Sequence, residues 1–131
     1  MIKKEKREVT VTIADYFDFK FEFDTDSKTE KICNEINNFW GGNIERLENA
    51  DNCIYNCVGR MIANEIIRLQ LKSSFYCGEN NAIIAFNDGI EGFYPIDGSY
   101  GIKLTYCDDF ELNDLDVEFK QEVKEVRNEP K

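Results

Sequence analysis

The chain has 131 residues, enough for one domain with a substantial hydrophobic core. Its 26 acidic and 16 basic residues give a net charge of −10, which argues against a basic surface for DNA or RNA. The sequence contains no histidine, the side chain used most often as a general base and as a metal ligand. The composition therefore points away from hydrolases and zinc enzymes and toward a binding protein.

The cysteines and the N-terminal residues bear on location. The five cysteines are an odd number, and residues 1–8 are charged with no apolar stretch behind them. We therefore expect free thiols in a reducing cytoplasm and no secretory signal. Cys53 and Cys57 are one helical turn apart, but without histidine or a second close pair they favour core packing over a metal site. No apolar run reaches the roughly 20 residues of a membrane helix, so no membrane partner is expected.

Alternating residues near the N-terminus predict a β-hairpin. Apolar residues at positions 9, 11 and 13 alternate with threonine, and residues 14–16 are expected to turn the chain. Four phenylalanines then occupy every second position, with charged residues between them: Phe17, Phe19, Phe21 and Phe23. One face of the hairpin is therefore aromatic and must be covered. Residues 1–8 precede the first strand and are expected to be frayed.

A first helix is predicted to cover this aromatic face. Ser27 and Glu30 form a capping box at its start, and Gly41–Gly42 end it. Its apolar side holds Ile32, Cys33, Ile36, Phe39 and Trp40. The spacing of Trp40 is typical of a core position, and a subunit interface is the alternative.

A second, longer helix is predicted from an N-cap at Asn43 to about Lys72. Its apolar residues recur at spacings of three and four, as on one face of a helix. They are Ile44, Leu47, Ala50, Ile54, Cys57, Val58, Met61, Ile62 and Leu69. This pattern is the most persistent helical signal in the sequence.

Residues 81–87 are too short for periodicity to separate a helix from a strand, and a short helix closed at Gly89 is favoured. The rest of the chain adds a strand over 102–106 and one or two strands within 115–126. The order β-β-α-α-(α)-β-β predicts an α+β fold, in which an antiparallel sheet of about four strands has two main helices packed on one face. We expect a single domain over residues 1–131, with flexible ends at 1–8 and 127–131.

The segment from Gly92 to Gly101 is the strongest candidate for a site. Its glycines let the backbone approach a ligand, and consecutive N–H groups can form a concave anion nest. Flat faces for a base are offered by Phe93, Tyr94 and Tyr100, and polar groups by Asp97 and Ser99. The alternative is a structural loop whose aromatic residues complete the core.

Arg68 is the second candidate, because it follows the apolar Met61 by seven residues and so lies beside the packing stripe. An arginine there can stack on an aromatic ring or bind a phosphate with two donors. The alternative is that its stem packs along the helix while its head caps the last carbonyls. Arg60 lies on a more polar side of the helix and is a weaker candidate.

The acidic clusters favour a solvated surface over a cation site, because none matches a calcium-loop pattern. These clusters are Asp24 with Asp26; Asp108, Asp109 and Glu111; and Asp114 with Asp116. No metal site is expected.

Three segments resemble the phage and bacterial family known as domain of unknown function 2528: residues 36–41, 67–70 and 91–104. The run Pro-Ile-Asp-Gly-Ser-Tyr-Gly-Ile at 95–102 is the most distinctive of them, and the resemblance extends from about residue 9 to residue 119. We associate this family with the phage Thoeris anti-defence sponge of the first described type.

The resemblance implies a protein that is not an enzyme and needs no cofactor. Such sponges bind cyclic ADP-ribose isomers made by TIR-domain proteins of the bacterial host and hold them intact. They act in the host cytoplasm as homodimers or larger homo-oligomers with ligand pockets between subunits, and some members also take cyclic oligonucleotides at separate sites. The pocket residues implied for this chain are Arg68, Phe93, Tyr94, Asp97, Gly98 and Ser99.

Roles for these residues follow from the resemblance. Phe93 would stack on the adenine, Arg68 would contact the other face of the base or a phosphate, and Asp97 and Ser99 would hold ribose hydroxyls. Phe93 occupies a position that is often tryptophan in the family.

Two rival functions remain. An acidic protein-binding inhibitor of a host defence or nucleic-acid-binding protein would use carboxylates along one face, for which the segment 108–118 is the candidate. An enzyme would use Asp97 or Cys77 as its reactive group, but the sequence supplies no matching base or nucleophile pair.

Overall fold

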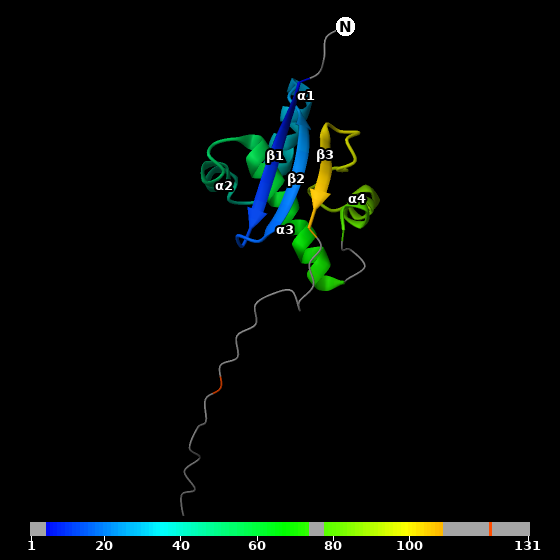
Figure 1. Cartoon of the computed structure of the whole chain (residues 1–131). Coiled ribbons are helices and arrows are strands. Elements are labelled where there is room, and N and C mark those ends of the chain that lie inside the picture. The colour runs from blue at the N-terminus through cyan, green and yellow to red at the C-terminus, as the bar shows by residue number, and fades with distance from the viewer. Residues whose placement is uncertain (1–4, 74–77, 109–120, 122–131) are drawn as a thin grey trace, which may run out of the picture.

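A three-stranded antiparallel sheet with helices on one face makes up the part of the chain that the computed structural model describes, residues 5–73, 78–108 and 121 (Figure 1). The elements are β1 (Lys6–Ile13), β2 (Phe17–Asp24), α1 (Ser27–Phe39), α2 (Asn43–Asn49), α3 (Ile54–Lys72), α4 (Glu79–Asp88) and β3 (Ile102–Cys107). The sheet order is β1-β2-β3, and α1 and α3 cross behind it. The predicted α+β class is confirmed.

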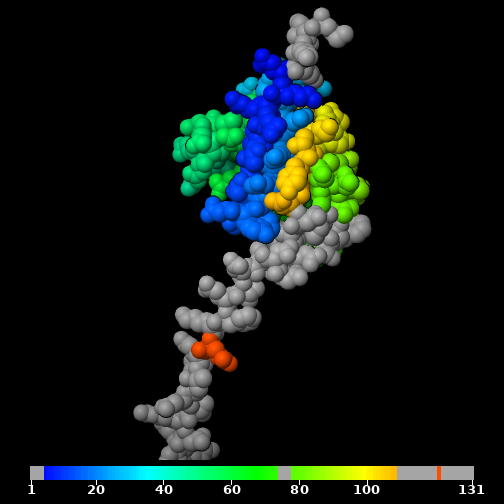
Figure 2. Space-filling model, viewed as in Figure 1, coloured from blue at the N-terminus to red at the C-terminus, as the bar shows by residue number. Residues whose placement is uncertain are grey.

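The β-hairpin forms as predicted. Ala14 and Asp15 both have positive φ, 58° and 56°, a geometry whose twist suits a tight hairpin turn. The four phenylalanines of β2 point to the helices and are at most 4% exposed. No helix of the described residues covers the other face of the sheet (Figure 2). Thr10 and Lys20, which alternate with the buried residues of their strands, are exposed.

The first strand begins earlier than expected. Lys6, Arg7 and Glu8 pair with residues 22–24 of β2, and Lys6 Nζ lies 3.7 Å from a Glu22 carboxylate oxygen. The prediction of a frayed segment through residue 8 is therefore wrong for these three residues. These three residues lie at the exposed end of the strand, so their side chains are charged and lack the apolar alternation by which a strand is predicted.

The third strand pairs with β2 as an antiparallel neighbour, and its outer edge is covered by a short extended segment. The Leu104 N–H donates to the Ile96 carbonyl at 3.0 Å, and the Gly98 N–H donates to the Ile102 carbonyl at 2.9 Å. The strands predicted within 115–126 and the tail at 127–131 lie outside the described residues, apart from Gln121.

Helix α1 starts and ends differently from the prediction. Its N-cap is Asp26, whose carboxylate accepts from the Thr29 N–H at 2.7 Å, so the Ser27–Glu30 capping box is wrong. At the other end Trp40 is the C-cap in an extended conformation. Phe39 and Trp40 are 53% and 38% exposed, so their assignment to the core is also wrong.

The long helix predicted over 43–72 is two helices, α2 and α3. Asp51 and Asn52 adopt left-handed φ values of 58° and 55° between them, and the Asn52 N–H bonds back to the Leu47 carbonyl at 3.0 Å. Asp and Asn tolerate this conformation better than most residues. The N-cap of α2 is Gly42 rather than Asn43.

Helix α3 provides the centre of the core. Gly59 allows it to approach the hairpin, since a Cβ there would lie 3.3 Å from Val11 and 3.5 Å from Phe21. The short helix predicted near 81–87 is confirmed as α4, and its C-cap is Gly89. No helix within the described ranges has the length and apolar character needed to cross a bilayer.

Cys33, Cys53 and Cys57 are free thiols, and Cys33, Cys57 and Cys107 are buried. Burial raises the pKa of the Cys33 thiol to about 12, so this thiol stays protonated at neutral pH. Across the residues that can be described, no three His, Cys, Asp or Glu side chains are grouped so as to hold a metal ion.

Candidate functional site

The segment Gly92–Gly101, called the glycine loop below, runs along α1 from its C-terminal end to its N-terminal end. Gly92 lies against Phe39 and Trp40, Tyr94 bonds to Glu35, and Gly101 lies against Thr29. Residues 29 to 39 of a helix span about 15 Å. The glycine loop is therefore stretched along α1 and is not closed into one cradle.

Two glycines in this loop are required by close packing. A Cβ on Gly92 would lie 2.6 Å from a Phe39 ring atom, and one on Gly101 would lie 2.1 Å from Thr29 Oγ1. Both also have positive φ, 83° and 84°. These two glycines therefore fit the alternative of a structural loop. A Cβ on Gly98, by contrast, would make only ordinary contacts with Lys103, at 3.7 Å.

An exposed aromatic cluster occupies the C-terminal end of α1. We call Phe39, Trp40 and Phe93 the aromatic shelf. The ring centroids of Phe39 and Trp40 are 4.9 Å apart, and those of Trp40 and Phe93 are 6.1 Å apart. The ring centroids of Phe93 and the buried Phe86 are 5.5 Å apart in a T-shaped arrangement, and this contact joins the shelf to the core. Large aromatic groups left in water together mark a binding surface.

The polar candidates lie at the other end of the loop. Asp97 Oδ1 accepts from the Ser99 N–H at 2.9 Å and from Ser99 Oγ at 2.5 Å. These hydrogen bonds lower the pKa of the Asp97 carboxyl. Gly98 lines a cavity of about 150 Å³ beside them, together with Lys6, Glu22, Asp24, Gly101 and Lys103.

Tyr94 connects the two ends of the loop and is held in place by α1. Its hydroxyl donates to a Glu35 carboxylate oxygen at 2.6 Å, and its ring lies 5.3 Å from that of Tyr100. The hydrogen bond to the carboxylate raises the pKa of the Tyr94 phenol, because it stabilises the protonated form.

Arg68 lies apart from the glycine loop within one chain. Its Nε donates to both carboxylate oxygens of Glu65, at 3.0 and 3.1 Å, and its side chain is 60% exposed. Gln70, two residues later, contacts Cys107 at the end of β3 that is remote from the loop. A six-residue strand spans about 17 Å, so the described contacts do not bring Arg68 to Asp97 or Ser99.

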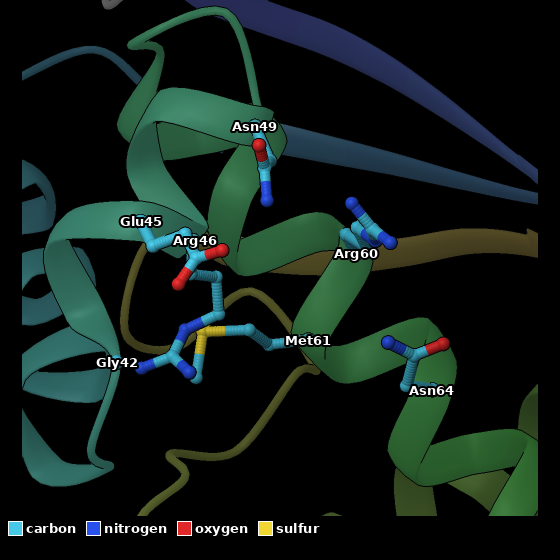
Figure 3. A pocket seen from close by; sticks show the side chains of 7 residues that line it. All are labelled: Gly42, Glu45, Arg46, Asn49, Arg60, Met61 and Asn64. Carbon is cyan, nitrogen blue, oxygen red and sulfur yellow. The ribbon is translucent and has the colours of Figure 1, made fainter.

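A pocket that sequence reasoning did not single out lies between α2 and α3 (Figure 3). Its volume is about 250 Å³, and it is lined by Gly42, Glu45, Arg46, Asn49, Arg60, Met61 and Asn64. Arg60 and Asn64 are four residues apart on α3 and thus on one side of it, which is the sequence signal that was available. The contribution of α2 depended on the unforeseen turn at 51–52.

Arg46 links this pocket to the aromatic shelf. Its guanidinium donates to the carbonyl oxygens of Asn37, Gly41 and Trp40 at 2.9 to 3.1 Å, and to Asn37 Oδ1 at 2.8 Å. It thereby caps the C-terminal end of α1. The shelf and the pocket consequently share one end of the molecule.

The chain is similar to a protein family and to two phage-derived proteins. The family model described as "Protein of unknown function (DUF2528)" matches residues 18–119. "Protein ea10" of Escherichia phage lambda and "Lambda prophage-derived protein ea10" of Escherichia coli O6:H1 (strain CFT073) are each 34% identical over 99 residues, covering 74% of this chain and 80% of the relative. No solved structure matches the chain.

Proposed function

This chain belongs to the DUF2528 family, and from that membership we propose that it is a phage anti-defence protein that binds cyclic ADP-ribose isomers. The molecules in question are the signals that TIR-domain proteins make in Thoeris immunity. The protein holds them intact in the cytoplasm of the host bacterium and so withholds them from the defence effector. The similarity to a lambda phage protein supports the phage part of this proposal.

The exposed aromatic shelf is the observation that carries the proposal. Stacking of a base on an aromatic side chain contributes about 1–3 kcal/mol. Trp40 is 38% exposed and Phe93 is partly buried, and their rings are tilted to one another at an interplanar angle of 42°. An adenine of the ligand stacks on these rings, which assigns Phe93 the role that the family resemblance implies.

Two features favour holding the ligand over cleaving it. The chain has no histidine to serve as a general base. The Asp97 carboxylate is occupied by hydrogen bonds from Ser99, and its pKa is lowered, so it is a weak base at neutral pH. Because Asp97, Gly98 and Ser99 lie at the end of the glycine loop remote from the shelf, they present polar atoms to ribose hydroxyls from a neighbouring copy of the chain.

A second copy of the chain completes the site in this proposal. Phe39 and Trp40 remain half open to solvent in one chain. A homodimer or larger homo-oligomer covers the shelf, excludes water from the ligand and offers surface groups from the neighbour. The chain carries ten excess negative charges, so long-range attraction does not draw in a diphosphate, and binding relies on local donors.

Incubation with cyclic ADP-ribose isomers, followed by removal of free ligand, heat denaturation and mass analysis of the supernatant, tests the proposal. We expect release of the isomer with unchanged mass. A changed mass would show catalysis. Release of nothing after incubation with every isomer would favour the rival function, an acidic inhibitor that binds a host protein.

A further inference from the structure

We infer that the pocket between α2 and α3 is a phosphate-binding subsite and that Arg60 is its main phosphate contact. The inference deepens the proposed function and rests on it, because it names the arginine that binds the diphosphate of the nucleotide. Arg60 takes this role in place of Arg68, whose guanidinium is held by Glu65.

The first support is that Arg60 is uncommitted. Its side chain is exposed at the pocket, and no hydrogen bond or ion pair joins it to any residue in 5–73 or 78–108. Arg68, eight residues later on the same helix, donates from Nε to the Glu65 carboxylate. A guanidinium that forms no ion pair with any described carboxylate is available to an anionic ligand.

The second support is the set of groups around Arg60. Figure 3 shows Asn49 on α2 and Asn64 on α3 bordering the same opening, and side-chain amides donate hydrogen bonds to phosphate oxygens. Glu45 on the opposite wall accepts from sugar hydroxyls. A volume of about 250 Å³ admits a diphosphate with part of its sugar, being several times the roughly 30 Å³ of one water.

The third support is the pocket's rigid wall and position. Arg46 adds positive charge at the wall, since all four of its hydrogen-bond acceptors are neutral amide oxygens. One of them is the carbonyl of Trp40, the central residue of the aromatic shelf. A ligand whose base stacks on the shelf thus has its phosphates within the same end of the molecule.

Arginine variants test this inference. We expect Arg60→Gln to weaken binding of the best cyclic ADP-ribose isomer about 10- to 100-fold, the effect of losing charge-assisted hydrogen bonds. Arg7→Gln is the matched control, because it removes the same charge from β1, where Arg7 contacts Cys53 and the Tyr55 ring. Equal unfolding midpoints of the variants would show that Arg60→Gln leaves the fold intact. Unchanged affinity in Arg60→Gln, or a loss seen only in Arg68→Gln, overturns the inference.

Inorganic pyrophosphate separates this inference from the proposed function. We expect it to shift the NMR signals of the Asn49 and Asn64 side-chain amides saturably, and we expect the shift to vanish in Arg60→Gln. If no cyclic ADP-ribose isomer binds the wild-type protein, the proposed function fails while pyrophosphate still probes the pocket. Amide signals that do not respond to pyrophosphate, or that respond equally in Arg60→Gln, would contradict the subsite.

Discussion

At the scale of single residues, the turn at Asp97–Ser99 has a pH dependence that can be measured. Hydrogen bonds from Ser99 lower the pKa of Asp97 below its ordinary value of 3.8. A lowered folded-state pKa contributes stability that is present above the unfolded value and is lost as the pH falls through the folded value. The turn therefore loosens only in strong acid.

We expect Ser99→Ala to raise the pKa of Asp97 toward 3.8, because the hydroxyl that stabilises the carboxylate is gone. A carboxyl carbon NMR titration measures this change directly. Ser99→Thr keeps a hydroxyl at the same position and serves as the control. A pKa of Asp97 that is the same in Ser99→Ala as in the wild type would show that the turn does not hold the carboxylate.

Residue patterns predicted side-chain burial well in the hairpin and poorly at the end of α1. The phenylalanine alternation of β2 fixes which face is buried, since successive side chains point to opposite faces. Trp40 has the spacing of a core residue, but the helix ends at Phe39 and the extended Trp40 leaves the helical face. Spacing rules fail once the backbone is no longer helical.

At the scale of elements, the N-cap of α1 is Asp26 in the structure, whereas the sequence pattern predicts Ser27. We expect Asp26→Ala to lower the free energy of unfolding by about 0.5–2 kcal/mol, because the Thr29 N–H loses its acceptor. Ser27→Ala is the matched control, and we expect a much smaller change since Ser27 is the first helical residue. Denaturant titrations of both variants measure the difference. A larger loss of unfolding free energy in Ser27→Ala would show that Ser27, and not Asp26, caps the helix.

The packing of the glycine loop on α1 gives a second test at this scale. We expect Gly101→Ala to destabilise the fold by about 2–5 kcal/mol, combining left-handed backbone strain with a clash against Thr29. Gly98→Ala has a similar φ of 97° but only ordinary contacts at 3.7 Å, so about 1–2 kcal/mol is expected. Chemical denaturation separates the two. Equal losses would mean that the close approach to Thr29 is absent.

The helices and strands themselves were largely predictable, and the connections between them were not. Periodicity located the hairpin, α1 and β3, because each has a buried face with a regular repeat. The segment of α4 is too short for periodicity to separate a helix from a strand. The break between α2 and α3 falls inside an uninterrupted apolar stripe. Its only signal is the pair Asp51–Asn52, whose left-handed conformation depends on the capping bond to Leu47.

At the scale of the whole molecule, the sequence could not show which ends of the elements meet. It grouped the glycine loop as one site, whereas packing along α1 separates the aromatic shelf from the Asp97–Ser99 turn. The pocket between α2 and α3 depends on three tertiary relations: the turn at 51–52, the cap by Arg46 and the crossing of the helices. None of these is encoded by a local repeat.

The proposed assembly makes a prediction about size in solution. We expect the protein to sediment as a dimer or larger at micromolar concentration, because the aromatic shelf is covered by another copy. Phe39→Ser should shift the protein toward the monomer. Tyr106→Ser is the matched control, since Tyr106 is also an exposed aromatic residue but lies on β3. A wild-type monomer at this concentration would contradict the shared site.

The most direct test of nucleotide binding at the aromatic shelf uses the fluorescence of Trp40, the only tryptophan in the sequence. We expect a cyclic ADP-ribose isomer to change the Trp40 emission saturably, and Phe93→Leu to weaken that binding about 5- to 150-fold through loss of a stacking face. An emission that stays constant while mass analysis shows bound isomer would place the ligand elsewhere and contradict the account.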